Sequence, residues 1–460
     1  MKRFAIEKLI RWAHKSDANP LVIRGARQVG KTTLVRMLAK QLAFQLIEVN
    51  METRPSFIPL LQDKSQAKTT LEGLLIEHNI NSDAQNVLFF FDEAQETPGL
   101  YSYLRYFKEL APQYKVVIAG SLFEFELVNN HHSQGPTGRV EFAYLEPMTY
   151  SEFLLAANAQ AYNQYETLDP HTPVPPILHE LLTKYYKEYL LCGGMPRAVK
   201  SWLTDKSALN VDEIKSDIVQ GYISDLPKYS ELDRSRYDPV LLTHLFNVIT
   251  SRPANGQKYV EFAPEYRSEK VKAHLAVLHT ARVIRQSVHT SQVQPPLLLG
   301  ANTKRYKYFA LDVGLTYTLL GLPISELYAA SDINGIANGI IAEQFVAQTL
   351  ASLPPYHKRH ALYHWERTAK NAQAEVDFML ALNGQVIPVE CKSGVSKKIR
   401  SLRVLLAEQP FALALRLYSG NVSTETIVNH HNGKDVKTTL LSLPHYLLER
   451  FVACNSELLD

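Results

Sequence analysis

The chain has 460 residues, whereas a single folding unit usually has about 100–150, so several folding units are expected. Hydrophobic residues make up 46% and charged residues 21% of the sequence, a balance that excludes disordered, collagen-like and low-complexity proteins. The 49 Lys and Arg residues exceed the 46 Asp and Glu residues by only three, so net charge does not by itself indicate a polyanionic partner.

Cysteine usage and hydropathy bear on the compartment. Cys192, Cys391 and Cys454 stand far apart, without the spacing of a zinc site or a disulfide framework. The longest apolar runs are far shorter than the roughly 20 residues that cross a bilayer, and the N-terminus lacks the apolar core of a signal peptide. We therefore expect a cytoplasmic protein with no membrane partner.

The first part of the chain alternates short apolar runs with amphipathic segments. This pattern is typical of a parallel sheet covered by helices. The runs are Leu21–Arg24, Leu46–Val49, Val87–Phe91 and Val116–Ala119. We predict an α/β nucleotide-binding domain over residues 1–150.

The next part is predicted to be helical. Helix-like stretches at Tyr150–Ala161 and Ile177–Leu191 flank a proline-rich connector at His171–Pro176. We assign residues 151–235 to a helical domain.

Residues 236–296 are expected to form a small unit of helices and strands. Its predicted elements are a helix at Pro239–Thr250, a strand at Tyr259–Phe262, a helix at Ser268–Thr280 and a strand at Val283–Val288. This order resembles a winged helix, and a small helical packing module fits it equally well. The Pro295–Pro296 pair marks the expected boundary to a last domain, residues 297–460.

A phosphate-binding loop is the strongest motif. Residues 25–32 read Gly-Ala-Arg-Gln-Val-Gly-Lys-Thr, between a predicted strand and a helix at Thr33–Leu42. Gly25 and Gly30 allow the backbone to curl so that its N–H groups point at phosphate oxygens. Lys31 is expected to reach the β and γ phosphates, and Thr32 to coordinate Mg²⁺.

Two acids follow the third apolar run. Asp92 is expected to hold the magnesium shell, and Glu93 to orient and deprotonate the hydrolytic water. This pairing indicates hydrolysis of ATP, although an acidic strand end is also a common helix cap. The expected nucleotide-binding residues are Gly25, Ala26, Arg27, Gln28, Val29, Gly30, Lys31, Thr32, Thr33, Asp92 and Ser121.

Three further residues are candidates for roles at this site. Ser121 follows the fourth apolar run, where its hydroxyl could sense the γ-phosphate or cap the next helix. Arg139 lies on a glycine-rich loop suited to an arginine finger, in its own or a neighbouring subunit, which would favour a homo-oligomer. Arg197 ends the turn Cys-Gly-Gly-Met-Pro-Arg and could couple the domains to phosphate.

The order of these motifs resembles a bacterial and archaeal family of AAA-type ATPases. The resemblance extends to Leu-Glu-Pro-Met-Thr-Tyr-Ser-Glu-Phe at 145–153, the glycine pair at 193–194 and Tyr-Phe-Ala-Leu-Asp-Val-Gly-Leu at 308–315. It implies an AAA-type ATPase core, a helical and winged-helix-like middle, and a C-terminal α/β domain similar to the PD-(D/E)XK nucleases (restriction-endonuclease-like). Members often have two serines after the glycine, whereas Leu122 follows Ser121 here.

A β-hairpin is predicted in the last domain, with its turn at Asn383-Gly384. With this turn, the residue numbers of each cross-strand pair add up to 767. Asp377 therefore faces Glu390, and Glu375 faces Lys392 on the same side of the sheet. The opposite side, which contains Val376, Phe378, Leu380, Leu382, Ile387, Val389 and Cys391, is expected to be core.

The two facing carboxylates are expected to hold a divalent cation. Like charges directly opposite each other destabilise a sheet unless a cation intervenes. Asp377, Glu390 and Lys392 match the D…E-x-K signature of the nuclease-like fold, with Lys392 orienting water or stabilising developing charge. In the family's pattern, Glu343 of the preceding helix joins the metal site. A sheet end in which Lys392 neutralises the acids is the alternative.

Two functions remain open. One is a Mg²⁺-dependent ATPase whose nucleotide state repositions a nuclease-like domain on DNA or RNA. The other is an ATPase switch whose C-terminal domain recognises protein partners without cutting. A basic cluster at Lys397, Lys398, Arg400 and Arg403 could contact phosphate, or could be a solvated helix face.

Overall fold

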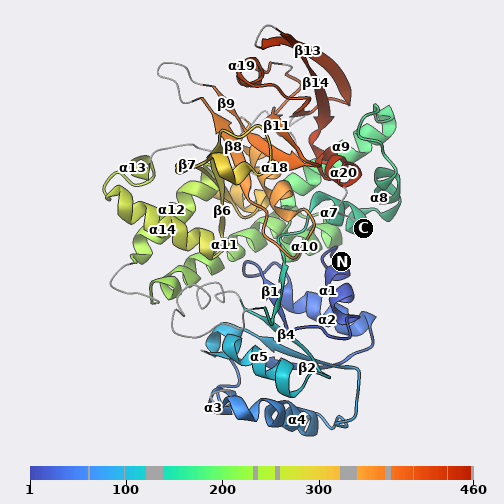
Figure 1. The fold of residues 1–460 in the computed structure, drawn as a ribbon, viewed down its shortest axis with the longest axis vertical. Helices are drawn as coiled ribbons and strands as arrows, with labels where there is room; N and C mark the ends of the chain where they lie inside the picture. Colours follow the sequence, from blue (N-terminus) through green and yellow to red (C-terminus); the bar gives the residue numbers. More distant parts are fainter. Residues whose placement is uncertain are drawn as a thin grey trace.

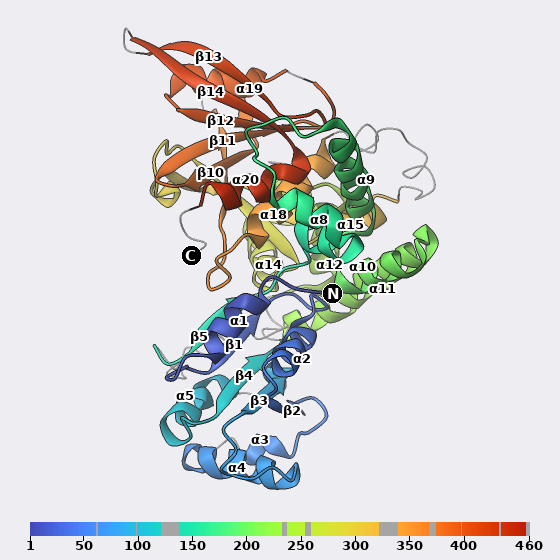
Figure 2. The ribbon, with the colours of Figure 1, turned by 90° about the vertical axis from the view of Figure 1, so that its right-hand side faces the viewer.

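The computed structural model of the protein describes residues 1–460 except 61–62, 98, 121–137, 232–236, 254–258, 322–338, 368–373, 397, 432–433 and 457–460. The first 150 residues lie at the bottom of Figure 1, the helical middle lies above them, and the C-terminal sheets lie at the top. A quarter turn keeps the same vertical order (Figure 2).

A five-stranded parallel sheet forms the N-terminal domain. Its strand order is β2-β3-β4-β1-β5. The strands are β1 (Leu21–Arg24), β2 (Gln45–Asn50), β3 (Val87–Asp92), β4 (Lys115–Ala119) and β5 (Glu141–Tyr144). The first four coincide with the predicted apolar runs to within one residue at each end, which confirms the expected α/β fold.

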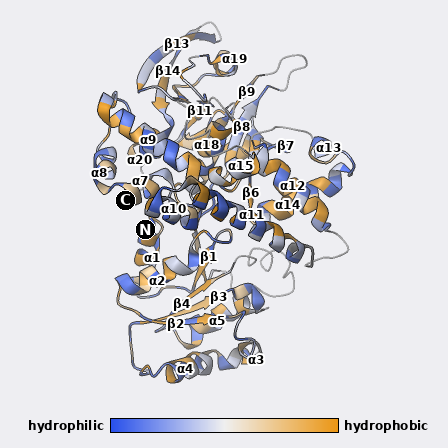
Figure 3. Ribbon diagram, turned by 180° about the vertical axis from the view of Figure 1, so that it is seen from behind, coloured by the Kyte–Doolittle hydropathy of each residue, from blue (hydrophilic) through white to orange (hydrophobic). Residues whose placement is uncertain are grey.

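Helices cover both faces of this sheet. They are α1 (Ile6–Ala13), α2 (Lys31–Gln41), α3 (Phe57–Leu60), α4 (Ala67–Glu77) and α5 (Leu100–Leu110). Successive β3 side chains alternate between the two cores: Leu88 and Phe90 pack with α1 and α2, whereas Phe89 and Phe91 pack with α4 and α5. Figure 3 shows the hydrophobic strands β3 and β4 in orange at the centre of the domain.

The helical middle contains α7 (Tyr150–Ala157), α8 (Ala159–Glu166), α9 (Pro176–Cys192), α10 (Pro196–Asp205) and α11 (Ala208–Glu231). The single helix predicted over 150–161 is wrong. It is interrupted at Asn158, whose side chain accepts hydrogen bonds from the backbone N–H groups of Gln160 and Ala161 and so starts α8 as a new helix.

The following elements are α12 (Pro239–Ser251), α13 (Tyr259–Phe262), α14 (Ser268–Thr280), β6 (Ile284–Thr290) and β7 (Ala301–Ala310). The predicted strand at Tyr259–Phe262 is wrong, because these residues form the short helix α13. Strands β6 and β7 pair antiparallel, so the Pro295–Pro296 pair lies in the connection of a hairpin. The domain boundary expected at residue 296 therefore falls between two strands that are paired with each other.

Strands β6 and β7 belong to a four-stranded sheet of order β7-β6-β8-β9, and a second sheet has the order β10-β11-β12-β14-β13. The remaining elements are α15 (Val313–Leu319), α18 (Ile340–Ser352), β8 (Leu362–Glu366), β9 (Glu375–Val376), β10 (Phe378–Leu382), β11 (Gln385–Cys391), α19 (Arg400–Glu408), β12 (Leu413–Tyr418), β13 (Ser423–His431), β14 (Lys434–Pro444) and α20 (Leu448–Cys454).

The β10–β11 hairpin has the predicted register. Phe378 pairs with Val389, and Leu382 pairs with Gln385, so the residue numbers of each pair add up to 767 as predicted. Both faces of the hairpin are buried, in contrast to the single core face expected: Phe378 and Val389 pack in the core that contains α18, and Met379 packs in the core that contains α19.

The predicted pairing of Glu375 with Lys392 is wrong. The hairpin ladder ends at Phe378, because the chain changes sheets at Asp377 and Glu375 pairs instead with Glu366 of β8. The Asp377 side chain takes the place of a backbone partner, since its Oδ2 accepts a hydrogen bond of 2.7 Å from the N–H of Cys391.

The Cys-Gly-Gly-Met-Pro-Arg turn joins the middle to the C-terminal part. Asp312 is fully buried and accepts hydrogen bonds from the N–H of Gly194 (2.6 Å) and from Gln348 of α18 (2.9 Å). Gly193 has φ of 71°, and a Cβ there would lie 2.1 Å from Asp312 Oδ1. The glycine pair is therefore required by close packing. Within the described part of the chain, no helix has the length and hydropathy to span a membrane.

Candidate nucleotide site and acidic cluster

The loop between β1 and α2 has the backbone that its glycines predict. Gly30 has φ of 97° and immediately precedes α2. A Cβ on Gly25 would lie 2.3 Å from the carbonyl oxygen of Leu145. Ala26 and Val29 are buried beneath the loop, whereas Arg27 and Thr33 are exposed. Gly30 is thus needed for its left-handed backbone conformation, and Gly25 is needed because a side chain there would clash with Leu145.

Lys31 is buried at the first position of α2. Its Nζ donates hydrogen bonds to the carbonyl oxygens of Gly25 (3.0 Å) and Ala26 (2.9 Å), inside the curve of the loop. Burial lowers the pKa of Lys31 to about 8, although Glu93 and Asp92 act in the opposite direction. The ammonium group is therefore held where an anion entering the loop would meet it.

Thr32 of α2 and Asp92 at the end of β3 come together. The hydroxyl of Thr32, after β1, donates a hydrogen bond of 2.6 Å to Asp92 Oδ2 at the end of β3. Burial raises the pKa of Asp92. A hydroxyl and a carboxylate in contact are oxygen ligands of the kind that Mg²⁺ prefers.

Glu93 follows directly and is held by a residue that the sequence analysis missed. Gln95 Nε2 donates a hydrogen bond of 2.8 Å to Glu93 Oε2. Gln95 also lies against the end of β4, because a Cβ on Gly120 would be 2.2 Å from its Oε1. Gln95 thus links Glu93 to the strand end that precedes Ser121. Ser121 itself lies outside the described residues.

Helix α11 packs directly on the loop. Arg27 forms an ion pair with Asp225, and its carbonyl oxygen accepts a hydrogen bond of 2.6 Å from the Tyr222 hydroxyl. A Cβ added to Gly221 of α11 would lie 3.2 Å from Nε2 of Gln28 in the loop. The loop therefore contacts the helical middle directly.

Arg3 is a second residue that the sequence analysis missed. Its guanidinium donates hydrogen bonds to the carbonyl oxygens of Val29 (2.7 Å) and Glu146 (2.6 Å) and to Glu152 (3.0 Å), which caps α7. Arg3 is 7% exposed. It joins the loop to the first helix of the middle part.

Arg139 does not lie near the nucleotide loop of its own chain, which corrects that part of the prediction. It precedes β5, whose Glu141 pairs with Leu21, the first residue of β1. The loop lies at the other end of these parallel strands. Arg139 forms an ion pair with Glu109 of α5. Arg197 is exposed and pairs with Asp217 at 3.0 Å, although its neighbour Pro196 lies beside Gly30.

The acidic residues of the C-terminal part converge on one cluster. Glu343 of α18, Asp377 and Glu390 of β11 meet around Lys307 of β7. Lys307 Nζ lies 3.5 Å from Glu343 Oε2 and 4.0 Å from Asp377 Oδ1. Lys392 Nζ donates a hydrogen bond of 2.6 Å to Glu390 Oε1. The predicted members are thus brought together.

Lys307 was not predicted, and it changes the electrostatics of the cluster. It is 1% exposed and also forms an ion pair with Glu375. Burial alone lowers the pKa of Lys307, but the carboxylates of Glu343, Asp377 and Glu375 raise it above its usual value. Burial, followed by the charge of Asp377, raises the pKa of Glu343 to about 8 and of Glu390 to about 7.

The fit of this cluster to a divalent cation is mixed. The Oε2 atoms of Glu343 and Glu390 are buried and accept no hydrogen bond from the described residues, although Lys307 Nζ forms an ion pair with the Glu343 oxygen at 3.5 Å. Four carboxylates, including that of Glu375, face two ammonium groups, so an ionised cluster carries two excess negative charges. Against this, no three His, Cys, Asp or Glu side chains in the described ranges are placed to hold a metal together. The ammonium of Lys307 forms ion pairs with three of the four carboxylates.

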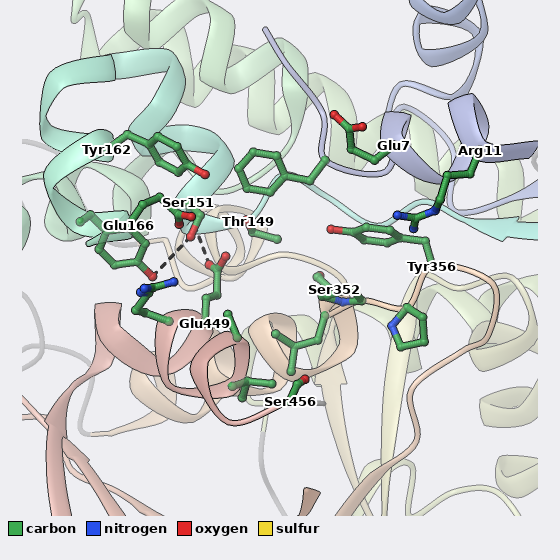
Figure 4. Close-up of a pocket in the computed structure, with 18 residues that line it drawn as sticks. Glu7, Arg11, Thr149, Ser151, Tyr162, Glu166, Ser352, Tyr356, Glu449 and Ser456 are labelled. Carbon is green, nitrogen blue, oxygen red and sulfur yellow. Dashed lines mark hydrogen bonds between the residues drawn. The ribbon is translucent and has the colours of Figure 1, made fainter. Parts of the chain in front are cut away.

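A separate cavity of about 310 Å³ lies between α1, α7, α8 and α20 (Figure 4). None of the predicted site residues that the structure describes lines it. One of its carboxylates, Glu449, accepts a hydrogen bond of 3.3 Å from the backbone N–H of Ser151. Burial raises the pKa of Glu449 to about 7. The cavity has a mixed lining of aromatic, acidic and basic side chains.

Comparison with known families agrees with the N-terminal site. Residues 17–154 match the AAA domain family. Residues 183–326 and 338–436 match two domains of unknown function, DUF8612 and DUF4143. No curated protein sequence matches the chain. The match supports an AAA-type P-loop domain in the first third of the chain, while neither of the other two families is described as a nuclease.

Solved structures resemble the chain at low identity. The Walker-type ATPase of Pyrococcus abyssi is 15% identical, over 68% of this chain and 95% of that chain, with a TM-score of 0.43. The ORC2 protein of Aeropyrum pernix, solved in ADPNP-ADP complexes, is 14% identical, over 74% of this chain and 94% of that chain, with a TM-score of 0.36. TM-scores this low support no inference about function.

Proposed function

We propose that the AAA-type domain binds ATP with Mg²⁺ and hydrolyses it, and that the nucleotide state acts on the C-terminal part through the helical middle. The contact that carries this proposal is the 2.6 Å hydrogen bond between Thr32 and Asp92. It joins the two oxygen ligands expected for magnesium beside the buried ammonium of Lys31.

In the proposed reaction, the backbone N–H groups of residues 25–33 and Lys31 bind the phosphates. Thr32 and Asp92 would hold magnesium, which would supply charge neutralisation to the triphosphate. Glu93 accepts the proton of the attacking water, whose oxygen forms a bond to the γ phosphorus while the bond to the ADP oxygen breaks. Gln95 acts as a positioning residue, because it holds the Glu93 carboxylate.

The test is Glu93→Gln, which keeps the shape and removes the base. ATP binding should be unchanged, and turnover should fall on the order of 10²- to 10⁴-fold. Glu96→Gln is the matched control, since Glu96 is exposed in the same turn, and it should leave turnover unchanged. Unchanged turnover in Glu93→Gln would mean that the base is assigned wrongly.

The coupling proposal rests on direct contacts of the loop. Arg27 binds Asp225 of α11, and Arg3 bridges the loop to Glu152 of α7. An arginine supplied by a neighbouring subunit, and therefore an oligomer, stays a prediction for Arg139.

A second candidate function is cleavage of DNA or RNA by the acidic cluster. The buried Glu390 Oε2, which has no hydrogen-bond partner among the described residues, favours it. If a divalent cation binds, Glu343, Asp377 and Glu390 would hold it, and it would supply Lewis-acid chemistry toward a phosphodiester. The alternative, a recognition module that binds protein partners without cutting, is favoured by the neutralising position of Lys307.

Cleavage of plasmid or oligonucleotide RNA and DNA, with Mg²⁺ or Mn²⁺, separates these candidates. Cutting by the wild type that is lost in Asp377→Asn but kept in Asp83→Asn, an exposed control, supports a nuclease. No cutting with either metal would leave the recognition module and would not affect the ATPase proposal.

A further inference from the structure

The cavity between α1, α7, α8 and α20 contains a carboxylate without a counterion among the described residues. This carboxylate is that of Glu449, at the second position of α20, and the cavity that it lines encloses about 310 Å³. Glu449 accepts a hydrogen bond of 3.3 Å from the N–H of Ser151, near the start of α7. In the part of the chain that the structure describes, no lysine, arginine or histidine forms an ion pair with it.

Aromatic side chains surround this carboxylate. The rings that line the cavity are those of Phe4, Tyr162, Tyr165 and Tyr356. The centroids of the Phe4 and Tyr162 rings are 6.0 Å apart. Figure 4 shows the Glu449 carboxylate and the Tyr356 hydroxyl pointing into the cavity from different sides. Because the face of an aromatic ring carries partial negative charge, such rings stabilise a cation.

The arginines at the cavity do not cancel the field of its carboxylates. Arg450 Nε donates a hydrogen bond of 3.0 Å to a backbone carbonyl oxygen, and Arg11 is exposed. Burial, followed by carboxylate charges that include that of Glu449, raises the pKa of Tyr162 and Tyr356. At both hydroxyls the carboxylates act more strongly than any arginine. The potential among these side chains therefore favours a cation.

We propose that this cavity binds a small organic monocation, a primary amine whose ammonium group pairs with Glu449 and whose apolar body lies against the aromatic rings. The volume is at the lower end of the range for small-molecule sites, about 300–1,000 Å³. An ammonium group supplies the N–H donors that a carboxylate and a phenol oxygen accept. A polyamine fits less well, because Arg11 and Arg450 would repel its further charges.

The cavity adjoins the nucleotide loop through the start of α7. Ser151, whose N–H binds Glu449, is followed by Glu152, which forms an ion pair with Arg3 at 3.0 Å. Arg3 in turn donates a hydrogen bond of 2.7 Å to the carbonyl oxygen of Val29 in the loop. This adjacency would let a bound amine act on ATP turnover. That effect rests on the proposed hydrolysis, whereas the binding of the amine does not.

Calorimetric titration of the nucleotide-free full chain with phenethylamine tests the proposal at pH 8, above the pKa of Glu449 of about 7. Phenethyl alcohol, which has the same body without the charge, is the matched ligand. We expect one amine per chain, bound on the order of 10- to 100-fold more tightly than the alcohol. Glu449→Gln should remove this preference, and it should fold because it removes a buried charge. Glu265→Gln, which changes an exposed glutamate, is the control and should bind like the wild type.

Three results would overturn the proposal: no saturable binding of the amine, equal affinities for the amine and the alcohol, or undiminished affinity in Glu449→Gln. Tighter binding of phenylalanine than of the amine would also overturn it, in favour of a zwitterion whose carboxylate meets Arg11. Tyr356→Leu locates the site from a different segment. Loss of this ring should weaken amine binding about 2- to 30-fold, and unchanged binding would place the amine elsewhere. None of these outcomes depends on ATP hydrolysis, because no nucleotide is present.

Discussion

Raising the pH from 7 to 9 should weaken ATP binding through Lys31 alone. Burial lowers the pKa of Lys31 to about 8, so about 90% of free molecules carry the ammonium at pH 7 and about 10% at pH 9. If only the charged form binds the triphosphate tightly, the apparent Kd rises about tenfold, or about 1.4 kcal/mol. The bound phosphates keep Lys31 protonated, so binding at pH 8 should take up about half a proton.

Isothermal titration calorimetry in two buffers of different ionisation enthalpy measures both quantities. Lys31→Arg is the control, because a guanidinium stays charged throughout this range and its affinity should be flat with pH. The reasoning would be refuted if the wild type bound ATP with the same Kd at pH 7 and 9 and took up no proton at pH 8.

Three further predictions concern stability. The raised pKa of Glu449, about 7, makes the stability of the wild type fall as the pH rises from 4.5 through 7. Glu449→Gln should therefore stabilise the protein by up to about 3 kcal/mol at pH 8 and by much less at pH 5. Thermal melts at the two pH values measure this difference, and an equal effect at both would contradict the prediction. Arg3→Met should lower the free energy of unfolding by about 3–5 kcal/mol, because it leaves Glu152 charged and buried. Adding Glu152→Gln to the same chain should recover part of this loss. A double variant that recovers nothing would count against the ion pair. Gly193→Ala should lower the melting temperature more than Gly73→Ala, because only the first Cβ meets Asp312; similar melting temperatures would contradict the packing argument.

The N-terminal fold could be predicted because its signals are local. Each apolar run is one buried strand, and the loop at 25–32 needs only its own glycines, lysine and threonine. The hairpin register was also predictable, because the turn at Asn383-Gly384 determines every pair up to Phe378 and Val389.

The errors occur where distant segments decide the structure. Glu375 is not part of the hairpin, because it pairs with Glu366 of β8, a strand that no local pattern relates to it. Tyr259–Phe262 is too short a run for periodicity to distinguish a strand from a helical turn.

The residues missed at the sites have the same origin. Arg3 acts on a loop 26 residues away and on Glu152, 149 residues away, and no local pattern marks it. Lys307 lies on a strand distant in sequence from the three carboxylates that it contacts. In both cases ion pairs that are distant in sequence and buried by tertiary packing determine the electrostatics of the site.

The contacts of the loop give the coupling a physical route. Arg3 and Arg27 bind the loop on one side and the helices α7 and α11 on the other. Asp312 then ties the turn before α10 to α18, which contributes Glu343 to the acidic cluster. These contacts form the route along which the proposed coupling between the loop and the cluster would act.

The most direct measurement is phosphate release from ATP by the purified chain with Mg²⁺, compared with Lys31→Ala. The wild type should release phosphate only when magnesium is present, and Lys31→Ala should release none because it no longer binds the triphosphate tightly. Absence of both nucleotide binding and turnover in the wild type, or undiminished turnover in Lys31→Ala, would contradict the assignment of this loop as the catalytic site.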